Sequence, residues 1–237
     1  MIGLQEKIKL QDWEYVSQSL SSKGYAIIPR LLSKVDCETL KACYSEDGLF
    51  RKTVVMERYR FGSGEYRYFR YPLPEIIQTL RTLVYPKLAP IANLWMKALK
   101  IDKAFPAEHT TLLKKCAAQG QKLATPLILK YRKGGYNTLH QDLYGEIYFP
   151  MQAVLFLNEE GKDYQGGEFV LTEQVPRAQS KAIVLRPKLG DMLIFCTNFR
   201  PVRGKKGYYR VSMKHGVSEV LEGERHTLGI IFHDAQS

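Results

Sequence analysis

Beyond about residue 126, short runs of apolar, β-branched and aromatic residues alternate with Gly, Pro, Asn and Asp. This pattern predicts strands, because such side chains fit a pleated, half-buried surface and the intervening residues favour turns. Several short strands within roughly 110 residues are typical of a β-sandwich or a jelly roll. The strands that we predict are 127–132, 138–142, 147–157, 167–172, 181–186, 191–196, 211–217 and 225–233.

The first half of the chain has the spacing of amphipathic helices. Trp13, Val16 and Leu20 recur at three- and four-residue steps, and Gly24 follows as a helix end. Segment 25–28 then predicts a short strand. A second helix is expected after Ser33, which suits an N-cap with Asp36 three positions on.

Two more helices are expected between residues 76 and 99. They should be separated near Pro86 and Pro90, since proline removes a helical hydrogen bond and clashes with the preceding turn. The expected organisation is a mostly helical support region, 1–125, followed by a β domain, 126–237. The fold class is therefore mainly β with helical support.

Composition and charge narrow the class of protein. Of 237 residues, 45% are hydrophobic and 25% charged, which excludes a disordered, coiled-coil or collagen-like chain. No apolar run reaches the roughly 18 residues of a membrane span, and the first residues do not resemble a signal peptide. The four cysteines form no C-x-x-C pair, so we expect a reducing, cytoplasmic setting and no membrane partner. The net charge of +11 raises the question of an anionic partner.

Three residues predict a metal centre. His140 and Asp142 lie on a predicted strand, where alternate residues face the same side, so they offer one nitrogen and one carboxylate together. His215 lies several strands further on and can return beside them in an antiparallel sheet. Two histidines and one carboxylate are typical of non-haem Fe(II) oxygenases, with zinc as the rival metal.

Arg225 predicts an anion site next to this centre. It shares one face of the last strand with Thr227 and Gly229, while the alternate positions are apolar. An arginine that points into the interior of a barrel is costly unless an anion accompanies it. A dicarboxylate would provide that anion through a bidentate pair.

Taken together, these motifs resemble the 2-oxoglutarate- and Fe(II)-dependent dioxygenases, in particular their prolyl-hydroxylase-like branch. The H-x-D pair, the distal His215 and Arg225-x-Thr227 occur in the order of that family. Segments 129–135, 153–158, 164–169 and 187–195 also resemble its strands and glycine turn, and 24–29 resembles its N-terminal lead-in. The resemblance covers 127–234 and implies a double-stranded β-helix, which is a jelly-roll core.

The resemblance also implies an activity. The enzyme would hydroxylate a substrate with Fe(II), 2-oxoglutarate and O2, with ascorbate as an optional reductant, and release succinate and CO2. The resemblance assigns Fe(II) binding to His140, Asp142 and His215. It assigns 2-oxoglutarate binding to Arg225, Thr227 and Tyr131.

For some residues the sequence also permits a purely structural role. Tyr131 can be an ordinary core-edge tyrosine, and Thr227 an ordinary strand residue. His226 faces away from Arg225 and is expected at the surface or in packing, His233 is expected to be structural, and His109 to be solvated.

Two basic segments bear on the substrate. Segment 199–214 has six basic residues and no acidic one, and we expect it to form a loop at the mouth of the site. Segment 58–70 interleaves arginines with aromatics around Gly-Ser-Gly and predicts a β-hairpin. The sequence does not decide whether either forms a lid, or whether they recognise a substrate or are solvated surface.

The substrate is expected to be anionic or to bear an anion. A protein or small-molecule substrate is preferred. A nucleic-acid-directed oxidative demethylase is the alternative. It ranks lower because Ile231 stands where such enzymes have a second arginine. A non-catalytic basic jelly-roll binding module is the alternative from another class of protein.

Overall fold

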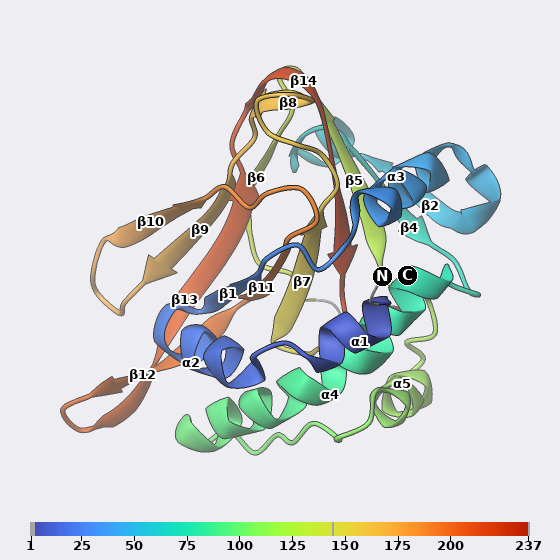
Figure 1. The fold of residues 1–237 in the computed structure, drawn as a ribbon. Coiled ribbons are helices and arrows are strands. Elements are labelled where there is room, and N and C mark those ends of the chain that lie inside the picture. The colour runs from blue at the N-terminus through green and yellow to red at the C-terminus, as the bar shows by residue number, and fades with distance from the viewer. Residues whose placement is uncertain (1–2, 144, 237) are drawn as a thin grey trace.

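Two antiparallel sheets face each other in a computed structural model that describes residues 3–143 and 145–236 (Figure 1). The order of the larger sheet is β1 (Tyr25–Ile28), β11 (Met192–Cys196), β7 (Met151–Phe156), β14 (Val220–Ile230), β5 (Leu127–Arg132), β4 (Glu65–Phe69) and β2 (Phe50–Val55), with β8 (Tyr164–Gly166) paired to β14. The order of the smaller sheet is β10 (Ser180–Leu185), β9 (Phe169–Gln174), β13 (Gly207–Val217), β6 (Tyr136–His140) and β3 (Gly62–Ser63), with β12 (Phe199–Gly204) paired to β13.

This arrangement confirms a mainly β fold with helical support and a jelly-roll core. Each of the eight strands predicted beyond residue 126 is present, although several bounds differ by a few residues. The largest difference is in the last strand, which begins at Val220 instead of 225. The short strand β8 and the strand β12 are not among those predicted.

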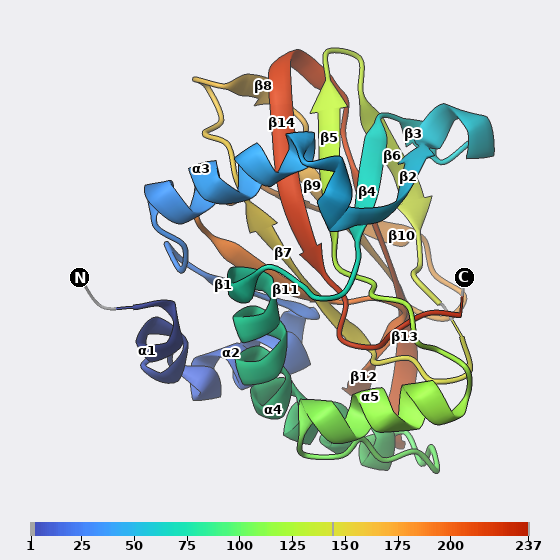
Figure 2. The same ribbon diagram turned by 90° about the vertical axis from the view of Figure 1, so that its right-hand side faces the viewer.

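The helices cover the larger sheet (Figure 2). They are α1 (Leu4–Lys9), α2 (Trp13–Lys23), α3 (Lys34–Ala42), α4 (Glu75–Ala98) and α5 (His109–Ala118), with short 3-10 turns at Cys43–Ser45, Asp47–Leu49 and Met56–Tyr59. The caps are those that the sequence indicates: Gly24 ends α2 in the left-handed region, and Ser33 and Asp36 form a reciprocal capping box at α3.

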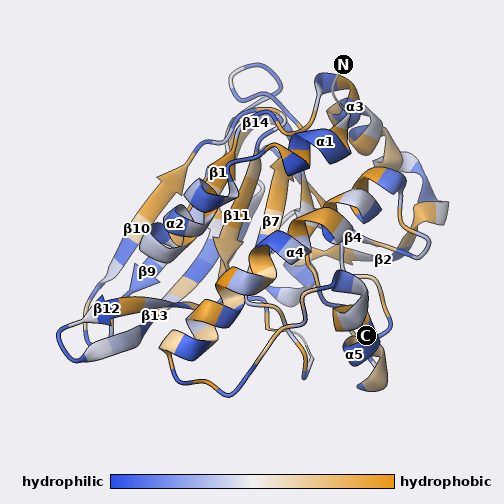
Figure 3. Ribbon diagram, turned by 60° about the horizontal axis from the view of Figure 1, so that its bottom comes forward, coloured by the Kyte–Doolittle hydropathy of each residue, from blue (hydrophilic) through white to orange (hydrophobic). Residues whose placement is uncertain are grey.

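One continuous helix, α4, replaces the two that we expected between residues 76 and 99. Pro86 and Pro90 both lie inside it. The residues before them, Tyr85 and Ala89, are completely buried, as are Leu80 and other positions of the same stripe. Figure 3 shows this hydrophobic face against the strands of the larger sheet. Burial of the stripe therefore outweighs the hydrogen bonds that the prolines remove.

The N-terminal region also contributes strands to the sheets. β1 pairs with β11, and β4 lies between β2 and β5. The 1–125 and 126–237 regions thus share both the larger sheet and one hydrophobic core. The outer bounds of these regions, 1 and 237, lie outside the described residues.

Both basic segments fold differently from the prediction. Segment 58–70 is not a hairpin of its own: β4 pairs with β2 and β5, whereas β3 pairs with β6 of the other sheet. Segment 199–214 is not a loop at the mouth of the site. It forms the hairpin of β12 and β13, which projects from the fold at the lower left of Figure 1.

Candidate metal centre

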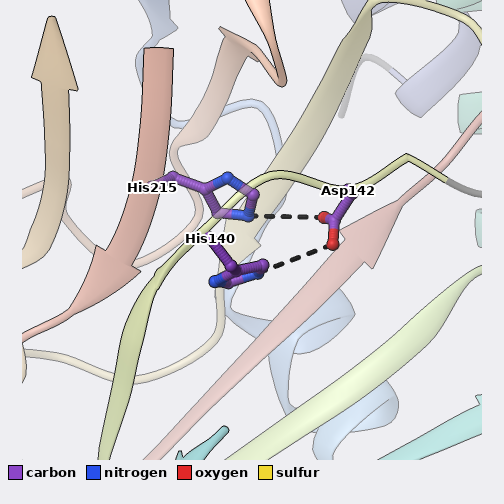
Figure 4. A group of neighbouring side chains, drawn as sticks. All are labelled: His140, Asp142 and His215. Carbon is purple, nitrogen blue, oxygen red and sulfur yellow. Dashed lines mark ion pairs between the residues drawn. The ribbon is translucent and has the colours of Figure 1, made fainter. Parts of the chain in front are cut away.

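His140, Asp142 and His215 converge on one point (Figure 4). Each offers one ligand atom, and these atoms all lie within 4.8 Å of one another. Asp142 contacts both histidines, with 3.5 Å from Oδ1 to His140 Nε2 and 3.3 Å from Oδ2 to His215 Nε2. Two imidazoles and a carboxylate on one side of a point match the facial set that binds Fe(II) and leaves positions open.

The register of the smaller sheet produces this convergence. His140 is the last residue of β6, and its Cα pairs directly with that of His215 on β13. The rings of these two histidines lie with their centroids 4.1 Å apart. Asp142 follows just beyond the end of β6 and is nearly buried, at 8% exposure. Antiparallel pairing therefore joins ligands that are far apart in the sequence.

The surroundings of His140 suit a neutral metal ligand. Its Nδ1 lies 2.7 Å from the carbonyl oxygen of Thr138, an acceptor that requires the proton on Nδ1 and leaves Nε2 free to bind a metal. Burial, and then the nearby His215, lower the pKa of His140. The ring of His215 packs against Phe195 and Phe169, whose ring centroids are 4.7 and 6.0 Å from its own.

A cavity of about 260 Å³ lies between the sheets and contains these three residues. Its remaining polar lining includes Asn137, Gln152, Arg225 and Thr227. Most of the wall is apolar or aromatic, from side chains such as Leu129, Tyr131, Val154, Phe169, Phe195 and Ile231. A mainly apolar cavity with a few convergent polar groups is typical of a small-molecule site.

Arg225 is the cation of this cavity. It is only 1% exposed, and none of its guanidinium nitrogens has a hydrogen-bond partner within residues 3–143 and 145–236. Its guanidinium carbon lies 5.4 to 5.9 Å from the ring centroids of Phe156, Tyr131 and Tyr164. A buried charge of this kind needs an anion, and a carboxylate suits its planar fork.

Glycine makes room for Arg225. Gly167 has a φ of +62°, and a Cβ there would lie 2.9 Å from Arg225 Cδ and 2.8 Å from Val220 Cγ2. A larger residue at this position would meet both the strain of the left-handed region and these close contacts.

The two other predicted cosubstrate residues line the same cavity. Tyr131 pairs with Arg225 across β5 and β14, and Thr227 lies two positions further along the same face of β14. Both are at most 2% exposed. Burial raises the pKa of Tyr131 to about 12, so the phenol stays protonated and can donate a hydrogen bond.

The remaining histidines are buried. The prediction that His109 is solvated is wrong. Its side chain is 2% exposed, because the start of α5 packs on Tyr85 and Phe232. One of its ring nitrogens lies 2.8 Å from the carbonyl oxygen of Phe232. His226 is 8% exposed on the opposite face of β14 from Arg225, and Nδ1 of the completely buried His233 accepts from the Phe149 amide.

Sequence reasoning missed two polar residues of this region. Gln152 is 5% exposed in the cavity wall, and its amide nitrogen has no hydrogen-bond partner among the described residues. Gln141 lies between two of the converging residues and bonds to the turn and strand behind them. Gln141 could have been found from its place as the middle residue of H-x-D. Strand alternation turns its side chain away from the side that His140 and Asp142 share, towards the segments behind them.

Comparison with known proteins gives one matching family model. It covers residues 64–235, and its description is "Oxygenase, catalysing oxidative methylation of damaged DNA". Two relatives are uncharacterized proteins of Mycobacterium tuberculosis, MT2286 from strain CDC 1551 / Oshkosh and Rv2227 from strain ATCC 25618 / H37Rv. Each is 44% identical over 167 residues, which is 70% of this chain and 72% of the relative.

Similar solved structures support the fold. A Pseudomonas putida prolyl-4-hydroxylase is 14% identical with a TM-score of 0.53, covering 95% of this chain and 100% of that one. A 2OG-Fe(II) oxygenase family oxidoreductase from Burkholderia pseudomallei is 14% identical with a TM-score of 0.56, covering 95% and 94%. A Trichoplax adhaerens prolyl hydroxylase, in complex with a hypoxia inducible factor peptide fragment, is 15% identical with a TM-score of 0.54, covering 96% and 90%.

No helix in the part of the chain that the structure describes is both long and apolar enough to cross a membrane.

Proposed function

We propose that this chain, which belongs to the Oxygenase-NA family, is a 2-oxoglutarate- and Fe(II)-dependent dioxygenase of the prolyl-hydroxylase-like branch. It would hydroxylate its substrate at the centre of His140, Asp142 and His215. The family implies Fe(II), 2-oxoglutarate and O2. The observation that carries the proposal is the convergence of these three residues beside a buried, unpaired Arg225.

The residues present fit both groups. The two histidines and Asp142 would bind the iron, with the proton of His140 held on Nδ1 by the Thr138 carbonyl. Arg225 would bind the distal carboxylate of 2-oxoglutarate, and Thr227 and Tyr131 would donate hydrogen bonds to it. When bound, these groups supply the oxidising power that hydroxylates a C–H bond, with succinate and CO2 as coproducts.

The protein side chains would define where this chemistry occurs. Apolar walls at Val154, Phe169 and Phe195 exclude water around the cosubstrate. Arg225 fixes the cosubstrate at the deep end, so the substrate must approach from the side of His140, the most exposed of the three metal residues. Positioning and exclusion of water are the contributions of the fold.

For the substrate, we favour an alkylated base in nucleic acid. The family description concerns damaged DNA, which moves this alternative ahead of a protein or small molecule. Phe61 lines the cavity, and its ring stacks on Tyr59 at 5.5 Å with both side chains about half exposed. Exposed aromatic faces next to Arg58 and Arg60 suit a base and its phosphate. Ile231 replaces the second arginine of nucleic-acid demethylases, so it argues against that one contact and not against the activity.

The metal and cosubstrate roles can be tested first. Anaerobic addition of Fe(II) and 2-oxoglutarate to the protein should produce the visible charge-transfer band of their chelate, and O2 should then give succinate. His215→Ala should abolish both, whereas His109→Gln, at a buried histidine that does not line the cavity, should retain both. A band of equal strength in His215→Ala would contradict the assignment.

The substrate class has a separate test. Hydroxylation of an N-methyl group inserts one oxygen atom of O2 into its C–H bond, and the product then releases formaldehyde as the C–N bond breaks. An oligonucleotide with an N-methylated base should therefore yield formaldehyde and succinate in equal amounts. Succinate formation stimulated by a proline peptide, without formaldehyde, would instead support the protein alternative.

A further inference from the structure

The outer face of the smaller sheet carries a surface of one charge sign. Five of the six basic residues of segment 199–214 are exposed there or at the hairpin turn: Arg203, Lys205, Lys206, Arg210 and Lys214. None of them forms an ion pair with a carboxylate of the described chain. The sixth, Arg200, points inward and pairs with Glu173 at 2.6 Å. One of the six basic side chains of the hairpin therefore stabilises the fold, and the other five are exposed to solvent.

Strand alternation places aromatic rings among these cations. Tyr208, Arg210 and Lys214 share the outer face of β13, and Arg203 is the register partner of Tyr208 on β12. Tyr208 is 52% exposed, so its ring is open to a planar partner. Alternating cations and exposed rings are the arrangement that binds a nucleic-acid strand through phosphates and bases.

A groove of about 470 Å³ adjoins this surface. It is lined by Arg177 from the turn between β9 and β10, by Arg210 and Phe199, and by Tyr148. The guanidinium of Arg210 lies 5.0 Å from the centroid of the Phe199 ring. No described carboxylate lines the groove. Its chemistry, two arginines with two aromatic rings, suits an anion that carries flat groups.

The groove also reaches the partners of Gln141, the residue between His140 and Asp142. Asn198 and Ser212 line it, and both accept hydrogen bonds from the amide of Gln141, at 3.0 and 3.3 Å. Gln141 itself lines the catalytic cavity. The groove and the cavity are therefore linked through Gln141, which lines one and is hydrogen-bonded to two residues that line the other.

We propose that the hairpin and this groove bind the sugar–phosphate backbone of the substrate strand outside the catalytic cavity. We call this surface, made of Arg177, Phe199, Arg203, Lys205, Lys206, Tyr208, Arg210 and Lys214, the outer basic surface. The proposal rests on the proposed function for its choice of nucleic acid. Unopposed charge alone would also attract an acidic peptide, but the exposed rings favour a strand whose bases can stack.

The experiment measures binding of a fluorescent single-stranded oligonucleotide to the full chain over a range of salt concentrations. The test variant is Arg177→Gln/Arg203→Gln/Arg210→Gln. The control, Lys23→Gln/Lys34→Gln/Lys115→Gln, removes the same charge at exposed positions elsewhere. Loss of three phosphate contacts should lower the slope of log affinity against log salt by about 2 and weaken binding about 100-fold at 0.1 M salt.

A second pair of variants tests stacking. Tyr208→Ala should weaken binding at least about fivefold, as expected for the loss of one stacked base. Tyr15→Ala is its control, since Tyr15 is equally exposed at 52% but lies on α2. The Tyr15 variant should bind as the wild type does.

Three results would overturn the proposal: equal losses in test and control variants, no salt-dependent binding by the wild type, or competition by poly-glutamate as strong as that by the oligonucleotide. The visible band of Fe(II) and 2-oxoglutarate should be unchanged in all these variants. Loss of that band in the wild type would instead count against the proposed function, so the two failures can be told apart.

Discussion

The side-chain amide of Gln141 donates a hydrogen bond of 2.8 Å to the main-chain carbonyl of Met213. Met213 lies on β13 two residues before His215, and Gln141 lies between His140 and Asp142. The same amide reaches the carbonyl of Asn198 at 3.0 Å. One side chain thus joins the two segments that carry the converging residues.

Replacement of Gln141 by Leu should therefore loosen the metal centre without removing a ligand. We expect Co(II), used as a stand-in for Fe(II), to bind about tenfold more weakly, the lower end of the effect seen when support around metal ligands is lost. Calorimetric titration measures this affinity. Gln11→Leu, which removes an amide bonded only to the Lys7 carbonyl, is the control. Equal metal affinities in both variants would contradict a positioning role.

Arg225→Met should have opposite effects on the protein with and without cosubstrate. It replaces a buried, unpaired cation with an apolar chain, so the free protein should unfold at a higher temperature. The rise in melting temperature on addition of 2-oxoglutarate should disappear, because the loss of a buried charge partner weakens binding by about 2–5 kcal/mol. Arg225→Lys keeps the charge but not the planar fork, so its rise in melting temperature with 2-oxoglutarate should lie between those of the wild type and Arg225→Met. Undiminished stabilisation by 2-oxoglutarate in Arg225→Met would show that another residue binds its distal carboxylate.

Asp234→Asn should destabilise the fold strongly. Arg81 on α4 is completely buried, and its guanidinium lies 2.9 Å from Asp234 while donating to the carbonyls of Ile231 and Phe232. Removal of the carboxylate charge leaves a buried cation without its counterion, which costs about 3–5 kcal/mol.

The control for this change is Asp47→Asn. Asp47 also pairs with an arginine, at 2.6 Å, but its side chain is 91% exposed, so its loss should cost less than about 1 kcal/mol. Urea unfolding at constant pH compares the two. Similar losses of unfolding free energy in both variants would mean that burial does not make the Arg81–Asp234 pair more important for stability than an exposed pair.

His109 should make the protein sensitive to acid. Burial, and then the charge of Arg81, lower its pKa from 6.5 to about 4 in the folded state. The unfolded chain therefore binds more protons between these values. Stability from this residue is full above pH 6.5 and is lost as the pH falls towards 4, by about 2 kcal/mol between pH 7 and 5.

His109→Gln can still donate to the Phe232 carbonyl but does not titrate, so its unfolding free energy should fall less over this range. Lys115→Gln, on the exposed side of the same helix, is the control and should follow the wild type. A pH profile of His109→Gln that is parallel to that of the wild type would contradict the assignment.

Much of the fold follows from local rules that the sequence contains. The alternation in 127–132 predicts β5 with its bounds, and the reciprocal bonds of Ser33 and Asp36 need only neighbouring residues. The outward and inward faces of β14 follow in the same way, because period-two geometry is fixed by the backbone. For this reason the residue pattern alone places Arg225 and Thr227 together on one face of their strand, and that face lines the cavity.

Elements whose outcome depends on distant contacts could not be predicted in this way. Pro86 and Pro90 stay inside α4 because a buried stripe on the larger sheet outweighs their local penalty. His109 is buried because the distant Phe232 lies against it. Segment 199–214 forms a hairpin on the outer face because β13 continues without a break into His215.

The sequence by itself determined the type of chemistry: an H-x-D pair, a distal histidine and an Arg-x-Thr strand, each set by residue identity and spacing. Only the tertiary structure decided that His140 and His215 are register partners, that Gln141 links their segments, and that the basic segment lies on the outer face, away from the mouth of the cavity. The physical reason is that strand register depends on the free energy of burying both sheets together, and no single segment contains that information.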